Sequence, residues 1–199
     1  RDSVLIKNNC PSAAEVLPIV SGIAKVRYGK KEYSVNQAWG VTDVYNKIFS
    51  HKVVKGRFFN RGESEGSRKV AVIGEKAASE LFSGFDPIGE KIKIAGRKFT
   101  VVGLFEKKGK MLAFEMDDLV VMPITVAMNI FDTKGIIEID ASAKDDKLVA
   151  QLIKEIDLVF SKRLSKDDYH ITTQEGMMTI LSSFQWSLLP GRSSSRARL

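Results

Sequence analysis

The clearest hydrophobic pattern in the chain begins at residue 70. Residues 70–73 form an uninterrupted apolar run closed by Gly74, which is typical of a strand buried on both faces. The next residues, 75–82, are rich in helix formers and carry an acid in the first turn, so they predict a helix. Ser83-Gly84 is expected to end that helix, because glycine readily adopts the left-handed conformation of a helix C-terminus.

A predicted hairpin completes this unit. Residues 91–94 alternate polar and apolar positions, as expected for a strand with one wet and one buried face. Ala95-Gly96-Arg97 supplies a three-residue turn, and 99–102 returns as the partner strand. Before the hairpin, Asp86-Pro87 predicts a turn in which the Asp86 side chain bonds a backbone amide two residues further on.

The segment 12–20 allows two interpretations. Pro11 and Pro18 bound several helix-compatible residues, so it fits a short helix or the end of a longer helix entering from a membrane.

The rest of the pattern predicts, in order, a hairpin of 19–28 and 33–41, a short helix from Thr42-Asp43 to Phe49, an exposed loop over 60–68, a strand over 119–122, a helix over 125–131, a strand over 136–141, an amphipathic helix over 145–164, a strand over 169–173 and a helix over 175–184.

Composition is that of an ordinary globular protein, with 44% hydrophobic and 28% charged residues among 199. No apolar run approaches the roughly 20 residues of a membrane-spanning helix, and residues 1–7 lack the apolar core of a secretory signal. We therefore expect the chain as given to behave as a soluble fragment. The single cysteine, Cys10, excludes an internal disulfide framework.

The net charge of +7 is mild once residues 186–199 are set aside, because three of the arginines lie there. Basic residues such as Lys30-Lys31, Lys52, Lys55 and Lys107-Lys108 are scattered and not gathered in one stripe, which argues against nucleic-acid binding. The favoured interpretation of these lysines is a solvated surface, and the alternative is contact with anionic lipid headgroups.

Several catalytic patterns can be rejected. Gly103 to Lys110 has five residues between its glycines and is followed by Met111, whereas a phosphate-binding loop needs four and then Ser or Thr. His51 and His170, with one cysteine, are too few ligands for a zinc site and are expected at the surface or at element ends. Gly62-Glu-Ser-Glu-Gly66 has the form of a nucleophile elbow but lies in a polar loop with no strand before it.

The acidic pair Asp117-Asp118 and the stretch before it each allow two interpretations. Asp117-Asp118 could be paired carboxylates for acid–base work, but we expect them to lead into a strand with their charges solvated. The preceding stretch is weakly patterned and either covers the sheet as loop or frayed strand, or forms an exposed apolar tip that meets a partner or a lipid. Its candidate contact residues are Met111, Leu112, Phe114 and Met116.

A set of short motifs occurs in a characteristic order. They are Gly56-Arg-Phe-Phe59, Val70-Ala-Val-Ile-Gly74, Leu81-Phe82, Asp86-Pro-Ile-Gly89, Ile92, Phe99-Thr-Val-Val-Gly103 and Asp117-Asp-Leu-Val-Val-Met-Pro123. In this order and spacing they resemble the extracytoplasmic core domain of MacB/FtsX-type ABC transporter permeases, over about residues 10 to 180. The 70–74 and 86–89 motifs favour the MacB branch.

The resemblance implies an α+β fold with two lobes. Residues 12–52 and 117–175 would form a discontinuous, porter-like α/β subdomain, and 53–116 an inserted, mainly-β, sabre-like subdomain. Residues 186–199 depart from the family, where a membrane helix should begin, and are expected to be a cloning remnant or disordered tail.

The resemblance also implies a function. The domain would lie on the extracytoplasmic side of the cell membrane, with membrane helices outside both ends, and would transmit ATP-driven conformational change to drive export or extraction of a substrate. It would need no cofactor or metal and would not itself be an enzyme. Its partners would be a second permease copy, a cytoplasmic ABC ATPase and a periplasmic adaptor. The alternative is an independent extracytoplasmic module that binds a lipid or small molecule, which would require a closed apolar pocket.

Overall fold

The computed structural model describes residues 2–111, 114–133 and 138–176. The helices are α1 Asp2–Asn9, α2 Tyr45–Ile48, α3 Arg61–Glu65, α4 Glu75–Phe82, α5 Ile124–Ile130, the 3₁₀ turn η1 Asp146–Leu148 and α6 Val149–Ser161. The strands are β1 Ala13–Tyr28, β2 Lys31–Val41, β3 Val53–Gly56, β4 Val70–Ile73, β5 Lys91–Ile94, β6 Arg97–Phe105, β7 Lys110–Met111, β8 Phe114–Glu115, β9 Leu119–Pro123 and β10 Glu138–Ala143.

Six strands close into a ring, which we call the barrel. Their order is β1-β2-β9-β4-β6-β5, and β5 pairs back onto β1. The pairs β2–β9 and β4–β6 are parallel and the other pairs in the ring are antiparallel. The short strand β3 adds to the outside of β6. A ring of this kind leaves few unpaired strand edges, which suits a stable body.

The barrel has apolar packing on both faces of its central strands. One cluster fills the ring and packs against α4 and α5, and a second cluster covers the opposite face of β2, β9 and β4. This is why β4 and β9 are buried along their whole length and read as continuous apolar runs. Gly40 allows α5 to sit directly on β2, because a Cβ at this position would lie 2.1 Å from the Cβ of Ala127.

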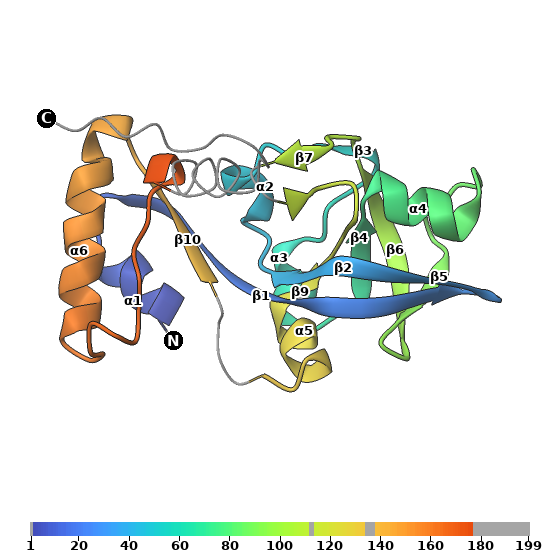
Figure 1. The fold of residues 1–199 in the computed structure, drawn as a ribbon, viewed down its shortest axis with the longest axis horizontal. Coiled ribbons are helices and arrows are strands. Elements are labelled where there is room, and N and C mark those ends of the chain that lie inside the picture. The colour runs from blue at the N-terminus through green and yellow to red at the C-terminus, as the bar shows by residue number, and fades with distance from the viewer. Residues whose placement is uncertain (1, 112–113, 134–137, 177–199) are drawn as a thin grey trace, which may run out of the picture.

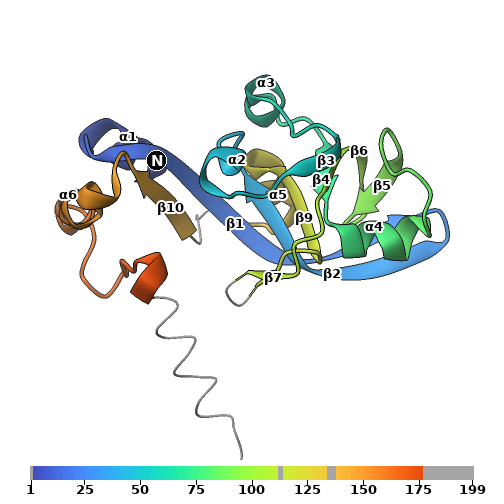
Figure 2. The ribbon, with the colours of Figure 1, turned by 90° about the horizontal axis from the view of Figure 1, so that it is seen from above.

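A separate layer stands at one end of the molecule. We call α1, β10 and α6 the terminal layer; they pack around a third cluster to which the beginning of β1 contributes Ala13 and Val16. Figures 1 and 2 show this layer set apart from the barrel, with β1 running continuously from one to the other. The 16 residues of β1 pair first with β10 and then with β2, so one strand belongs to both parts.

The mixed α and β fold is as predicted, and most predicted elements are present. The 70–73 strand, the 75–82 helix and the two hairpins agree with β4, α4, β1–β2 and β5–β6. Ser83 ends α4 in the left-handed conformation, with φ of 52°. The Asp86 turn is confirmed, since Asp86 Oδ1 accepts a hydrogen bond from the Ile88 N–H at 3.0 Å. The long helix is shorter than predicted, because Asp145 caps η1 and α6 begins only at Val149.

Three predictions were wrong. Residues 12–20 are not helical but begin β1. The expected loop over 60–68 contains α3, which starts with a capping box in which Asn60 and Glu63 bond each other's backbone N–H groups. Residues 169–173 do not form a strand. Of the predicted last helix, only residues 175–176 fall within the described chain, and residues 186–199 lie outside it.

The predicted boundaries at 53 and 116 fall inside one core. The cluster that fills the barrel contains Val26 from before the first boundary, Ala71 from between the two, and Val120 from after the second. The core of the barrel therefore draws on residues from before, between and after the two predicted boundaries. Among the described residues, no helix has both the length and the apolar character required to cross a membrane.

Candidate functional site

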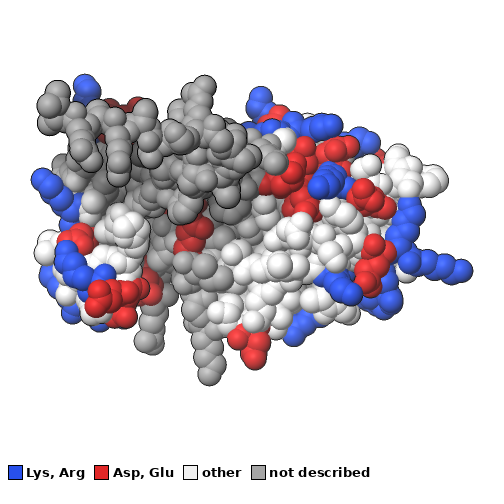
Figure 3. Space-filling model, in the orientation of Figure 1, with Lys and Arg blue, Asp and Glu red and all other residues white. Residues whose placement is uncertain are grey.

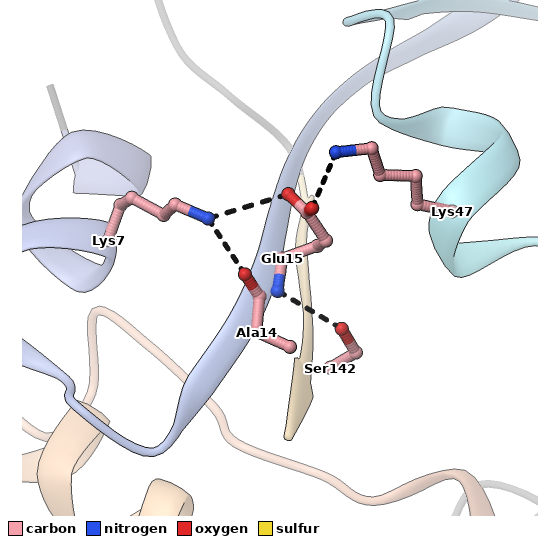
Figure 4. Close-up of polar contacts among 5 residues, drawn as sticks. All are labelled: Lys7, Ala14, Glu15, Lys47 and Ser142. Atoms are coloured by element: carbon pink, nitrogen blue, oxygen red, sulfur yellow. Dashed lines mark hydrogen bonds and ion pairs between the residues drawn. The ribbon is translucent and has the colours of Figure 1, made fainter. Parts of the chain in front are cut away.

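A charged tie joins the terminal layer to the barrel at Glu15 (Figure 4). The Glu15 carboxylate pairs with Lys47 Nζ of α2 at 2.7 Å and with Lys7 Nζ of α1 at 3.4 Å. Lys7 Nζ also donates to the Ala14 carbonyl oxygen at 2.7 Å. Glu15 thus pairs with one cation from α1 of the terminal layer and with one from α2, whose Tyr45 packs in the cluster that covers the outer face of the barrel strands.

The backbone at Glu15 is also irregular. The pairing of β1 with β10 shifts register between Ala13 and Glu15, and the Glu15 N–H donates to the Ser142 hydroxyl at 3.2 Å (Figure 4). The hydrogen bond from Lys47 holds the pKa of Glu15 below its usual range, and Glu15 in turn raises the pKa of Lys47. Because the folded-state pKa of Glu15 is depressed, its stabilising contribution is present at neutral pH and is lost as pH falls through that pKa.

Two buried carboxylates, Asp117 and Asp118, accept hydrogen bonds at the base of the β7–β8 hairpin. The Asp117 side chain, 5% exposed, accepts hydrogen bonds from the N–H groups of Lys108 at 2.7 Å and Gly109 at 3.0 Å. Asp118, 1% exposed, accepts from the Asn36 side-chain amide at 3.0 Å. The expectation that both charges are solvated was wrong, because both residues are buried and accept hydrogen bonds, Asp117 from the opposite side of the hairpin base and Asp118 from Asn36 of β2.

His51 packs beneath the same hairpin and is not at the surface. Its ring stacks on Phe105 with centroids 4.0 Å apart, and only 2% of the residue is exposed. Nε2 lies 3.2 Å from the Glu106 carbonyl oxygen, which can only accept, so Nε2 carries the proton and Nδ1 accepts from the Tyr45 hydroxyl at 3.3 Å. Burial lowers the pKa of His51, which favours the neutral ring that this pair of contacts needs.

The predicted contact tip is only partly described. Met111 and Phe114 lie opposite each other where β7 pairs with β8, and Leu112 lies outside the described residues. Met116 does not belong to an exposed tip, because it is fully buried in the cluster that also contains Phe105. Of the four candidate contact residues, Met111 and Phe114 are therefore the two that lie on the described strands of the hairpin.

The structure brings no reactive centre together from the residues considered in the sequence. His170 is exposed beyond α6, and Gly62–Gly66 lies on α3, outside the strand–turn–helix context of an elbow. Within the described ranges, no group of three or more His, Cys, Asp or Glu side chains is placed to hold a metal. The described surface has a hollow of about 390 Å³ beside α6, lined by residues such as Lys154 and Tyr169, and another of about 360 Å³ between Gly56 and Gly89.

Solved structures share this fold. The periplasmic region of MacB from Actinobacillus actinomycetemcomitans superposes with a TM-score of 0.76 at 19% identity, covering 92% of this chain and 81% of that one. The extracellular domain of the ABC-type transporter YknZ from Gram-positive bacteria gives 0.74 at 17% identity, covering 86% and 87%. The fold is therefore that of the extracytoplasmic domains of such transporters.

Sequence comparison then shows the family. The MacB-like periplasmic core domain matches residues 1–159, and the chain belongs to this family. It is 31% identical over 163 residues to the macrolide export ATP-binding/permease protein MacB of Bdellovibrio bacteriovorus, covering 81% of this chain and 25% of that protein. It is 28% identical over 180 residues to the pyoverdine export ATP-binding/permease protein PvdT of Pseudomonas aeruginosa, covering 89% and 27%. The chain thus spans about a quarter of the length of these two relatives.

Proposed function

We propose that this chain is the part of an ABC export permease that carries ATP-driven motion through the extracytoplasmic space. The observation that supports it most directly is β1, a single strand of 16 residues shared by the terminal layer and the barrel. A displacement of α1 or α6 would reach the barrel through this strand and through the Glu15 tie, without a flexible linker between them. Packed elements transmit small shifts in this way because a close-packed core has low compressibility.

In this proposal ATP is hydrolysed outside this chain, in another part of the full transporter. The ATPase is a cytoplasmic domain or subunit, and the moving body is paired with a second permease copy. A periplasmic adaptor is a further proposed partner. The named relatives export a macrolide and pyoverdine, which differ in chemistry, so the proposal extends to export and not to one substrate.

The hairpin tip is proposed as a contact with a partner. The Asp117 side chain holds the base of this hairpin by accepting the N–H groups of Lys108 and Gly109, and the His51–Phe105 stack is buried nearby. A rigid support lowers the entropy cost of ordering a contact residue. No feature of the described residues favours the alternative of an independent lipid-binding module over this proposal.

The test replaces Glu15 with Gln in the full transporter and measures export and ATP hydrolysis together. An ion pair of this exposure contributes up to about 1 kcal/mol, so we expect roughly a fivefold loss of export per ATP hydrolysed. Glu32→Gln is the matched control, because Glu32 pairs with Lys25 at 3.2 Å in the β1–β2 hairpin, away from the terminal layer. The proposal is contradicted if the unchanged transporter, the Glu15→Gln variant and the Glu32→Gln variant all export the same amount of substrate per ATP hydrolysed. Phe114→Glu in the same assay tests the tip, which is rejected as a contact if export is unchanged.

A further inference from the structure

Basic side chains from three strands lie in register on the outside of the barrel. Arg27 of β1 pairs with Lys93 of β5, and Lys93 pairs with Lys98 of β6. Their sequence neighbours in these strands point into the barrel core and are fully or almost fully buried: Val26, Ile92, Ile94 and Phe99. Since side chains alternate along a strand, the three cations point outward.

The same face extends by one further outward-facing residue along each of two strands. Lys25 lies two residues before Arg27 on β1, and Lys91 two residues before Lys93 on β5. We call Lys25, Arg27, Lys91, Lys93 and Lys98 the basic face. Glu32 borders this face: it lies opposite Arg27 on β2, and its carboxylate pairs with Lys25 at 3.2 Å. Figure 3 shows Lys and Arg side chains along this end of the molecule, where β1, β2 and β5 meet, with Asp and Glu side chains among them.

This arrangement is unfavourable for the folded chain by itself. Neighbouring strands lie about 4.8 Å apart, and like charges placed directly opposite each other in a sheet are destabilising. Within the part of the chain that the structure describes, Arg27, Lys91, Lys93 and Lys98 have no ion pair. The basic face therefore calls for an anion that the chain does not supply.

We propose that the basic face binds an extended polyanion that bears phosphate groups. Three cations repeated at strand spacing, with Lys25 and Lys91 on opposite sides of that row, fit a chain of separate negative charges better than one compact anion. A folded protein partner fits less well, because protein interfaces are depleted in lysine and depend on a buried aromatic or aliphatic centre. The residues paired with the outer lysines are small and polar, Ser34 opposite Lys25 and Thr100 opposite Lys91. Binding by charge and counterion release needs no such apolar centre.

The location makes this site independent of the proposed transmission of motion. The basic face lies toward the end of the barrel that is remote from the terminal layer, with the length of β1 between them (Figure 1). None of its residues contacts the Glu15 tie or the hairpin base in the interactions described above. Loss of polyanion binding and loss of coupling can therefore be separated by experiment.

The test measures binding of long-chain inorganic polyphosphate to the chain by isothermal titration at several salt concentrations. The triple variant Arg27→Gln, Lys93→Gln, Lys98→Gln removes the row of registered cations. The matched control, Lys76→Gln, Lys147→Gln, Lys154→Gln, removes three exposed lysines from α4, η1 and α6. Both variants lose the same net charge, so they differ only in where the charge lay.

At about 50 mM salt we expect the face variant to bind at least about tenfold more weakly than the unchanged protein, and the control variant no more than about threefold more weakly. The slope of log affinity against log salt should fall by about 2 to 3 for the face variant, since each phosphate-neutralising cation contributes roughly 0.7 to 0.9. The melting temperature of the face variant should equal or exceed that of the unchanged protein, because like-charge repulsion is relieved.

The proposal is overturned if the unchanged protein shows no saturable binding, or if both triple variants lose affinity equally, which would mean a diffuse effect of net charge. Competition by inorganic monophosphate at equal phosphate concentration would indicate a single-phosphate site and contradict an extended ligand. Poly-glutamate that binds as tightly as polyphosphate would assign the face to acidic proteins instead of phosphate chains.

Discussion

Replacing Phe105 with alanine is expected to destabilise the chain by about 3–5 kcal/mol, the usual cost of truncating a buried aromatic side chain. Phe105 is fully buried and stacks on His51, with Tyr45 and Phe58 at ring-centroid distances of 5.8 Å and 6.2 Å. Its removal leaves a cavity beneath the hairpin and takes away the surface that shields His51 from water. Urea unfolding followed by circular dichroism measures the change.

The control for this substitution is Phe85→Ala. Phe85 is 77% exposed on the turn after α4, so the same truncation there should change stability by no more than about 0.5 kcal/mol. Similar losses at the two positions would show that the packing around Phe105 does not support the hairpin as described.

Asp117→Ala is expected to cost about 2–3 kcal/mol, because it leaves two backbone N–H groups without their acceptor at a buried position. The amides of Lys108 and Gly109 should then exchange their hydrogens faster, which NMR-detected hydrogen exchange would show directly. Asp86→Ala serves as the comparison: Asp86 also accepts a backbone N–H, but it is exposed and water can replace it.

For Asp86→Ala we therefore expect a loss below about 1 kcal/mol. An Asp117 variant that is as stable as the Asp86 variant, with unchanged exchange at residues 108 and 109, would mean that the carboxylate does not hold the hairpin base.

Local patterns predicted much of the barrel. A continuous apolar run identified β4, because only a strand covered on both faces can be apolar at every position. Turn chemistry identified the Asp86 turn and the end of α4, since both depend on residues within three positions of each other. The capping box at Asn60 and Glu63 was equally local and could have been recognised, but the surrounding polar residues favoured a loop.

The features on which the two proposals rest depend on contacts between distant segments. Glu15 and Lys47 are 32 positions apart, and nothing in either neighbourhood indicates the pair. The basic face was missed for the same reason: the sequence shows scattered cations, and only the register of β1, β5 and β6 places Arg27, Lys93 and Lys98 side by side. Asp117 and Asp118 looked solvated because their backbone and amide partners come from elsewhere in the chain.

Residues 12–20 were misread for a related reason. Alanine, glutamate and leucine favour a helix locally, but pairing with both β10 and β2 overrides that preference. Pro18 is tolerated within β1 opposite Ile139, next to the short edge strand β10.

The central claim is that the terminal layer and the barrel move as one body. It is tested most directly by measuring spin-label distances in the full transporter, with labels at Leu158 of α6 and Val54 of β3. Both side chains are exposed, at 60% and 58%, whereas Cys10 is 2% exposed and shielded from the reagent. With and without a bound ATP analogue, we predict an unchanged distance between the two labels of one chain and a changed distance between the same label in the two copies. A nucleotide-dependent distance within a single chain would contradict the claim.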